Sequence, residues 1–345
     1  MSGSNAALSA QEIAASPAWY PLELSGPGLV RLARLDAAAY RGASFLDQRI
    51  LQLRPEQAVA SVATVGSAAA ALTPRAHYIF HVGHVGSTLV SRLIGELPGL
   101  FSVREPVLLR EIALAPGRER IWGTLDLRDA LSLLGRKWHP AQRAVIKASS
   151  FVSEIAERAL QLDASASAIL MFTPALAYLR CIMGGPNSRL ESQALAPSRL
   201  ARLRKRLGGA PTADPRSEGE WIAMSWLCEM VCLEAAARHF ASRVVWIDFD
   251  EFLATPREGL EAVLKALGAD VDPKETAGLL AGPLMRRYSK APQYAYDAAL
   301  RQEVLAAAER EHAAQIRQGM AWLEALAASH PIIAEALGRR AGVAG

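Results

Sequence analysis

The stretch from Tyr78 to Leu93 constrains the fold more than any other part of this 345-residue chain. An apolar run is followed by a loop with two glycines, and Ser87 and Thr88 then open an amphipathic segment. A strand, a glycine-containing loop and a helix in this order direct backbone N–H groups and the positive end of the helix dipole at one point. We therefore predict an anion-binding loop made of Gly83, His84, Val85, Gly86, Ser87 and Thr88. The alternative is a tight strand-to-helix turn in which Ser87 or Thr88 only caps the helix.

The chain after Pro74 alternates short apolar runs with longer segments of helical periodicity. Strands are predicted at His77–Val82, Leu100–Val103, Ala144–Ala148, Ala168–Phe172 and Arg243–Ile247. Helices are predicted at Thr88–Glu96, Leu125–Lys137, Val152–Gln161, Pro174–Met183, Glu218–Phe240 and Asp297–Ala327. Such alternation with continuously apolar strands predicts an α/β fold, in which helices cover both faces of a P-loop-type parallel sheet. Ligands then bind at the carboxyl ends of the strands.

Two segments depart from this alternation. Residues 1–73 are apolar in part but carry no recognisable chemistry, so we predict an N-terminal extension packed on a core domain of residues 74–345. Residues 186–216 form a helical insertion that is rich in basic side chains: Arg189, Arg199, Arg202, Arg204, Lys205 and Arg206. This insertion is either a solvated basic helix or a mobile lid over an anionic ligand.

Composition narrows the classes of function. A formal net charge of only +4 does not imply nucleic-acid binding, and the longest weakly polar run falls short of the roughly 20 apolar residues that a membrane span needs. Residues 1–16 lack the pattern of a signal peptide, so a cytoplasmic protein is expected. Cys228 and Cys232 stand four residues apart without the spacing of a zinc site, which predicts buried thiols and no metal.

The loop itself separates two kinds of phosphate chemistry. A nucleotide kinase or NTPase requires a Lys before the final Ser or Thr, and Ser87 stands in that place, while His81 replaces the first Gly. The run His84-Val85-Gly86-Ser87-Thr88 instead resembles the 5′-phosphosulfate-binding loop of sulfotransferases, with His84 at the family's basic position. The resemblance implies the donor 3′-phosphoadenosine 5′-phosphosulfate and transfer of its sulfuryl group to a hydroxyl or amine. The acceptor cannot be read from the sequence.

The resemblance extends in blocks from about Ala76 to Tyr296 and implies two catalytic residues besides His84. Glu105 follows the second strand, where tyrosylprotein-type and bacterial sulfotransferases carry the proposed general base. Its alternative role is an ion pair with Arg104 or Arg110, or a carboxylate at a helix N-terminus. Lys147 ends the third strand, where the family's Lys stabilises the departing phosphate; the alternative is a solvent-exposed strand end. Ser149 stands where the cytosolic branch has a catalytic His, which favours Glu105 as the base.

The same resemblance implies a site for the donor's 3′-phosphate. Arg287 and Lys290 lie in a basic segment that matches the family's phosphate-binding loop, although a basic surface loop is equally consistent with this composition. The family's Arg before Pro174 is absent, and Arg180, one helical turn further on, is the candidate to replace it. Two other functions stay open: a divergent small-molecule kinase, and a degenerate P-loop protein that binds a nucleotide or partner without turnover.

Overall fold

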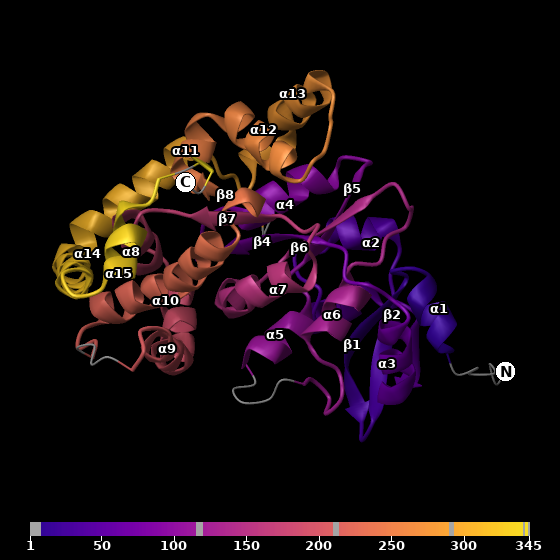
Figure 1. The fold of residues 1–345 in the computed structure, drawn as a ribbon. Helices are drawn as coiled ribbons and strands as arrows, with labels where there is room; N and C mark the ends of the chain where they lie inside the picture. Colours follow the sequence, from indigo (N-terminus) through magenta and orange to yellow (C-terminus); the bar gives the residue numbers. More distant parts are fainter. Residues whose placement is uncertain (1–7, 115–119, 210–213, 290–292, 341, 344–345) are drawn as a thin grey trace.

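The computed structural model describes residues 8–114, 120–209, 214–289, 293–340 and 342–343, and a six-stranded sheet lies at its centre (Figure 1). Its strands are β4 (His77–His81), β5 (Leu100–Arg104), β6 (Arg143–Lys147), β7 (Ala168–Phe172), β8 (Val244–Asp248) and β9 (Gly342–Val343). They lie in the order β5-β6-β4-β7-β8-β9, with the first five parallel and β9 antiparallel at one edge. The predicted α/β fold is confirmed, and each predicted strand agrees with the structure to within one residue at either end.

Helices cover both faces of this sheet, which explains why its strands are apolar throughout. α4 (Ser87–Gly95) and α12 (Pro256–Ala266) pack on one face, while α10 (Glu218–His239) and the 3₁₀-helix η2 (Ser150–Ile155) pack on the other. The connection after β4 passes β6 and leads to β5 at one edge of the sheet, whereas the connection after β6 passes β4 and leads in the opposite direction to β7. The loops that follow these two neighbouring strands therefore diverge, and α/β proteins bind their ligands at such a point.

Two predicted helices differ in extent from the observed ones. α6 (Leu127–Leu134) begins two residues later than predicted because the Asp126 side chain accepts a hydrogen bond from the Asp129 N–H at 3.0 Å and so fixes the first turn; it ends three residues early, with Gly135 as its C-cap. The predicted helix at 152–161 is divided into η2 and α7 (Ala156–Leu162). η2 begins immediately after the end of β6, and its 3₁₀ geometry is common in such short connections.

The C-terminal half adds a group of helices beside the sheet. These are α8 (Ala175–Met183), α9 (Pro186–Arg206), α11 (Phe249–Ala254), α13 (Pro273–Ala281), α14 (Ala298–Ala327) and α15 (Pro331–Gly338), with short 3₁₀ turns η3 (Ala241–Arg243) and η4 (Pro283–Arg286). α10 and α14 approach each other so closely that a Cβ atom on Gly219 would lie 1.8 Å from the Gln315 carbonyl oxygen. Only glycine permits this crossing.

The basic residues of α9 are engaged within the protein. Arg199 and Arg202 both pair with the buried Glu229 of α10, at 2.9 and 2.6 Å. Arg206 pairs with Glu154 of η2 at 2.9 Å. Because these pairs join α9 to its neighbours, α9 lies along α10 as part of the helical layer.

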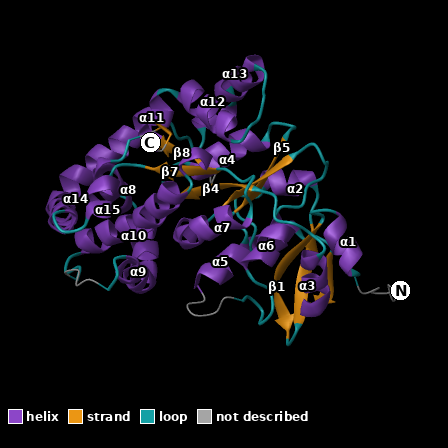
Figure 2. Cartoon of the chain, viewed as in Figure 1, coloured by secondary structure: helices purple, strands orange, loops and turns teal. Residues whose placement is uncertain are grey.

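The N-terminal segment forms a small unit against the β5 side of the sheet (Figure 2). An antiparallel sheet of β1 (Trp19–Gly26), β2 (Leu29–Arg34) and β3 (Gln57–Ser61) is flanked by α1 (Ala10–Ala15) and α3 (Val62–Ala70). The connection from β2 to β3 carries α2 (Ala37–Gly42) and the 3₁₀-helix η1 (Gln48–Leu53). Contacts join α2 to β5, α3 to α6, and β1 to α5 (Val107–Leu114), and one continuous cluster of buried apolar residues includes both units.

Arg104, at the end of β5, fastens the N-terminal segment to the sheet. Its guanidinium is 1% exposed and donates to the carbonyl oxygens of Tyr40, Arg41 and Ala43, which end α2. Burial lowers the pKa of Arg104 to about 9. The side chain is thus committed to helix capping, and the ion pair that the neighbouring Glu105 forms is with Lys147.

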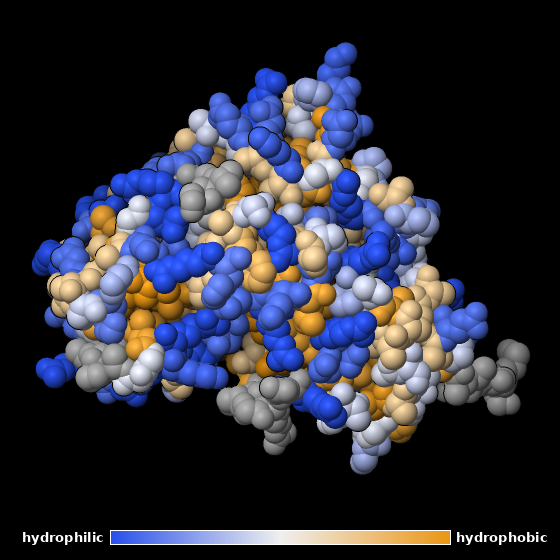
Figure 3. Space-filling view, in the orientation of Figure 1, coloured by the Kyte–Doolittle hydropathy of each residue, from blue (hydrophilic) through white to orange (hydrophobic). Residues whose placement is uncertain are grey.

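The molecular surface is mostly polar on the face seen in Figure 3, where the hydrophobic areas form separate patches between hydrophilic side chains. No helix in the described part of the chain is long and apolar enough to cross a membrane.

Candidate functional site

The loop after β4 contains three residues with a left-handed backbone conformation. Gly83, His84 and Gly86 have φ angles of 98°, 56° and 61°, all in the left-handed region. A Cβ atom on Gly86 would lie 1.9 Å from the ring of Phe249, so the loop requires glycine there for space as well as for conformation. His84 adopts the same conformation at a steric cost that glycine would not incur, and such strain is concentrated at functional sites.

The start of α4 leaves a hydroxyl group without a partner. Gly86 is the N-cap and makes no side-chain capping bond, so neither Ser87 nor Thr88 caps the helix. Thr88 is 3% exposed, and its Oγ1 has no hydrogen-bond partner among the described residues. A buried hydroxyl without a partner costs free energy, and a bound oxyanion beside this loop would satisfy it.

His81 joins the ends of two neighbouring strands. The Gly83 N–H donates to its Nδ1 at 3.0 Å, so Nδ1 carries no proton, and its Nε2 donates to the Ala148 carbonyl at 2.9 Å. The imidazole is therefore neutral and fixes the loop after β4 to the end of β6. Sequence reasoning treated His81 only as a departure from the NTPase pattern, because its second contact lies 67 residues away in the chain.

Glu105 and Lys147 meet at the carboxyl ends of β5 and β6. The Lys147 ammonium, 0% exposed, donates to one carboxylate oxygen of Glu105, and the Ser149 hydroxyl donates to the other at 2.9 Å. Glu105 has a φ of 47°, and its N–H donates to the Lys147 carbonyl at 2.7 Å. The pairing follows from register, because Arg104 lies opposite Lys147 in the parallel ladder.

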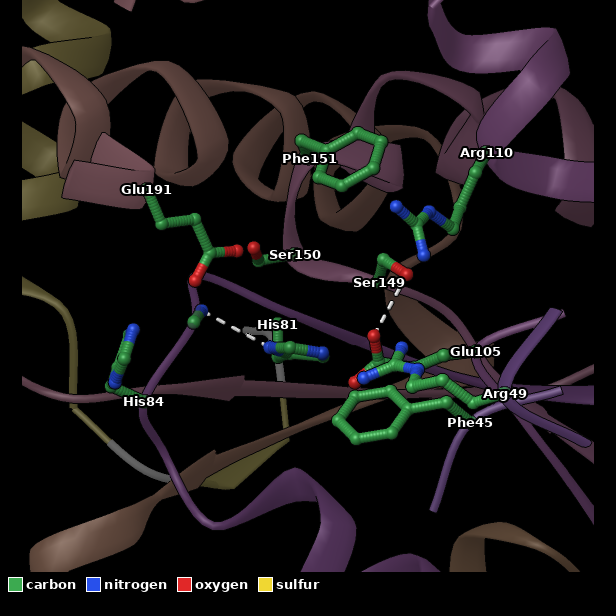
Figure 4. Close-up of a pocket in the computed structure, with 11 residues that line it drawn as sticks. Phe45, Arg49, His81, His84, Glu105, Arg110, Ser149, Ser150, Phe151 and Glu191 are labelled. Carbon is green, nitrogen blue, oxygen red and sulfur yellow. Dashed lines mark hydrogen bonds between the residues drawn. The ribbon is translucent and has the colours of Figure 1, made fainter. Parts of the chain in front are cut away.

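The Glu105 carboxylate lies at the side of a cavity of about 290 Å³, which we call the carboxylate cavity (Figure 4). It is lined by Phe45, Arg49, His81, Gly83, His84, Glu105, Arg110, Ser149, Ser150, Phe151 and Glu191. Figure 4 shows Phe45, Arg49 and Arg110 at the same end as Glu105, with His84 and Glu191 at the other end. Phe45 and Arg49 come from the N-terminal segment, in which the sequence analysis found no chemistry. An Arg close to an aromatic residue is common on protein surfaces, so nothing in the sequence marked Phe45 and Arg49 as site residues.

A second hollow, which we call the loop groove, has a volume of about 200 Å³ on the other side of the loop. The residues Val85 to Leu89 line it together with Phe249, Arg287, Tyr288 and Tyr296. The rings of Tyr288 and Tyr296 lie 5.6 Å apart, and burial raises the pKa of both phenols. His84 lines both the loop groove and the carboxylate cavity.

The three residues predicted to bind the donor's 3′-phosphate have different outcomes. Arg287 lines the loop groove, whereas Arg180 forms an ion pair with Glu309 at 2.6 Å and is not among the lining residues of the two cavities. Lys290 lies outside the described residues. Of the two predicted phosphate-binding cations that the structure describes, Arg287 lines the groove and Arg180 does not.

Arg301 of α14 is a charged residue at this site that the sequence analysis did not consider. It pairs with Asp250 through two nitrogens, at 2.6 and 3.2 Å, and lies over the Phe249 ring at 4.8 Å. Burial acts to raise the pKa of Asp250, but its bonds from Arg301 and Thr173 hold that pKa below its usual value. Asp248 accepts from the Asp250 N–H at 2.8 Å and caps α11. No cluster of three potential metal ligands occurs in the described ranges.

Comparisons with known proteins find likeness at the level of structure only. No family model and no curated protein matches the sequence. Among solved structures, a sulfotransferase domain from the curacin biosynthetic pathway has a TM-score of 0.40 at 14% identity, over 66% of this chain and 84% of that one. A sulfotransferase domain from the Synechococcus PCC 7002 olefin synthase has a TM-score of 0.38 at 14% identity, over 74% of this chain and 96% of that one. Mouse sulfotransferase SULT7A1, complexed with PAP, has a TM-score of 0.43 at 11% identity, over 80% of this chain and 93% of that one.

Proposed function

We propose that this protein transfers a sulfuryl group from 3′-phosphoadenosine 5′-phosphosulfate to a hydroxyl or amine. The observation that carries the proposal is that His84 lines both cavities, so an anion-binding loop and a buried carboxylate face a common point. Group transfer requires this arrangement, with a donor site and a base-containing acceptor site that meet where the bond is exchanged.

The loop groove has the groups that the donor requires. Backbone N–H groups at the start of α4 and the buried Thr88 hydroxyl suit the 5′-phosphosulfate, and His84 supplies a further donor. Arg287 suits a second phosphate, and the rings of Phe249, Tyr288 and Tyr296 suit a purine base.

The carboxylate cavity then holds the acceptor. As the acceptor oxygen or nitrogen attacks sulfur, a new O–S or N–S bond forms, the bond from sulfur to the bridging phosphate oxygen breaks, and Glu105 takes the acceptor's proton. Adenosine 3′,5′-bisphosphate leaves with the electron pair. Protonation of Glu105 removes the negative charge that Lys147 balances, so the ammonium can offset the charge that develops on the leaving phosphate.

A second candidate is a protein that binds the nucleotide without turnover. The contact of Glu105 with both Lys147 and Ser149 favours it, because a carboxylate with these partners must exchange one of them for the acceptor's proton. The engagement of Arg180 by Glu309 favours it as well. A small-molecule kinase has less support, because the loop carries Ser87 in place of the phosphate-binding Lys.

A cytoplasmic location is part of the proposal. Cys228 and Cys232 are buried thiols that form no disulfide. Free thiols are typical of proteins in a reducing compartment.

Thermal denaturation with a small set of nucleotides tests the assignment. Adenosine 3′,5′-bisphosphate at about 100 times its Kd adds roughly 2.7 kcal/mol of stability, which raises the Tm by several degrees. Adenosine 5′-monophosphate, which lacks the 3′-phosphate, is the matched control and should shift the Tm less. A shift with magnesium-ATP but none with the bisphosphate would reject the donor assignment. The non-catalytic candidate would be supported if the protein binds the bisphosphate but releases none from the donor when alcohols, phenols and amines are offered as acceptors.

A further inference from the structure

The charges around the carboxylate cavity are unevenly distributed between its two ends. Four ionisable side chains besides the histidines line it: Arg49, Glu105, Arg110 and Glu191. Lys147 already neutralises Glu105. The imbalance therefore lies with the two arginines at the Glu105 end of the cavity.

Both arginines share one carboxylate, that of Asp47. Arg49 contacts it through Nε at 2.8 Å and Nη2 at 2.5 Å, and Arg110 contacts it through Nη1 at 3.0 Å. Asp47 is 4% exposed; burial acts to raise its pKa, but the two guanidinium groups keep that pKa below its usual value. Two cations and one carboxylate leave a net positive charge at this end.

Arg110 keeps donors for a ligand. Its Nε and Nη2 have no hydrogen-bond partner among the residues that the structure describes, and its side chain is 34% exposed. A planar guanidinium with two such N–H groups matches a carboxylate. Glu191 does not cancel this charge, because it lies at the opposite end with His84 (Figure 4).

The cavity also limits the size and polarity of its ligand. About 290 Å³ lies just below the range for small-molecule pockets, which begins near 300 Å³. Phe45 and Phe151 supply apolar walls, and Arg110 lies over the Phe151 ring at 5.7 Å. A small molecule with an apolar body fits this space better than a peptide chain.

We propose that the acceptor is a small hydroxy acid, whose anionic group binds Arg110 and Arg49 while its hydroxyl faces Glu105. The inference rests on the proposed function for the reaction, but the anion site itself exists independently of the donor. Asp47 places both guanidinium groups, so it acts as a positioning residue.

Equilibrium binding to the purified full-length protein tests this proposal, with and without adenosine 3′,5′-bisphosphate. The probes are 4-hydroxyphenylacetate, the neutral 4-ethylphenol and the cationic tyramine, which share the hydroxyphenyl group and differ in charge. The acid should bind at least about tenfold more tightly than the neutral phenol, the usual effect of one charge-assisted contact. Equal or tighter binding of 4-ethylphenol or tyramine would overturn the proposal.

Four variants locate the effect. Arg110→Gln and Arg49→Gln each leave Asp47 one cationic partner, and each should reduce the ratio of acid to neutral affinity by about tenfold. Arg34→Gln is the control, because Arg34 pairs with Glu56 at an exposed site of the N-terminal sheet. Thermal denaturation checks that each variant is folded. If Arg110→Gln destabilises the chain, Arg110→Lys is the alternative: it keeps the charge and should retain most of the preference for the acid. Preference that survives both Gln variants would place the anion elsewhere and reject the proposal.

The two proposals fail in different ways. Selective binding of the acid with no binding of the bisphosphate would leave the anion site in place and reject the sulfuryl donor. Binding of the bisphosphate without charge selectivity among the probes would reject the hydroxy acid and leave the transferase proposal intact.

Discussion

At the scale of single residues, the Thr88 hydroxyl is the part of the proposed donor site whose role can be measured most directly. Thr88→Val keeps the shape of the side chain and removes a buried oxygen that has no partner in the described part of the chain. The free energy of unfolding of the ligand-free protein should stay the same or rise by up to about 1 kcal/mol, whereas bisphosphate affinity should fall about tenfold. Denaturant unfolding and calorimetric titration measure the two effects.

Ser132→Ala is the matched control for this substitution. Ser132 in α6 also has a buried oxygen without a partner in the described ranges, but it lines neither cavity. Its replacement should affect stability in the same direction and leave bisphosphate affinity unchanged. Equal affinities of Thr88→Val and the wild type would remove Thr88 from the donor site.

The Glu105–Lys147 pair is the second residue-scale feature with a measurable consequence. Lys147→Met leaves a buried carboxylate without its cation and should cost about 3–5 kcal/mol of stability. The double variant Glu105→Gln/Lys147→Met should recover most of this loss, because Ser149 can still donate to the amide oxygen. Urea unfolding of the wild type, the two single variants Glu105→Gln and Lys147→Met, and the double variant gives the coupling energy between the two side chains. Effects that add to within about 0.5 kcal/mol would show that the two groups do not interact in solution.

At the scale of elements, the junction of β8 and α11 carries a buried acid. Burial raises the pKa of the capping residue Asp248 from 3.8 to about 6. Because the folded state holds the proton more tightly than the unfolded state, this group stabilises the protein as pH falls below 6 and loses that contribution as pH rises through 6. Asp248→Asn keeps the capping oxygen and removes the charge.

The variant should therefore be more stable than the wild type at pH 8, and this advantage should diminish towards pH 5. Thermal denaturation across this range measures the difference in Tm. Asp272→Asn, at the N-cap of α13, is the control because its side chain is exposed to solvent. A Tm difference for Asp248→Asn that does not vary with pH would contradict the raised pKa.

At the scale of the whole molecule, the N-terminal segment holds the backbone around Glu105. The Leu46 N–H donates to the Arg104 carbonyl at 2.9 Å, and the Val107 N–H donates to the Leu46 carbonyl at 3.0 Å. The Tyr20 hydroxyl donates to the same Leu46 carbonyl at 2.7 Å and accepts from the Val107 N–H at 3.2 Å. These contacts bracket the left-handed residue Glu105 on both sides.

Tyr20→Phe should therefore lower turnover as well as stability. We expect a loss of about 1–3 kcal/mol in the free energy of unfolding and a lower kcat at unchanged donor affinity. Tyr40→Phe is the control: Tyr40 is equally buried in the same segment, but its hydroxyl donates to the Pro17 carbonyl at 2.9 Å. If both variants lose stability and kcat to the same extent, Tyr20 has no specific role in placing Glu105.

The sequence by itself determined the parts of the protein that depend on local order. Strand positions, the order of strands and helices, and the glycine-containing loop after β4 follow from periodicity and from the conformations that only glycine adopts without strain. These features involve neighbours in the chain, so a reading of consecutive residues predicts them. The proposed roles of Glu105 and Lys147 came from a resemblance to sulfotransferases and stay predictions.

Only the tertiary structure decided what surrounds these residues. Parallel register placed Lys147 against Glu105, and docking of the N-terminal segment placed Arg49 and Phe45 in the carboxylate cavity. Glu309, on a helix that lies more than a hundred residues further along the chain, engages Arg180. Each contact joins segments that are far apart in sequence, and its energy depends on burial and on charges that no local pattern contains.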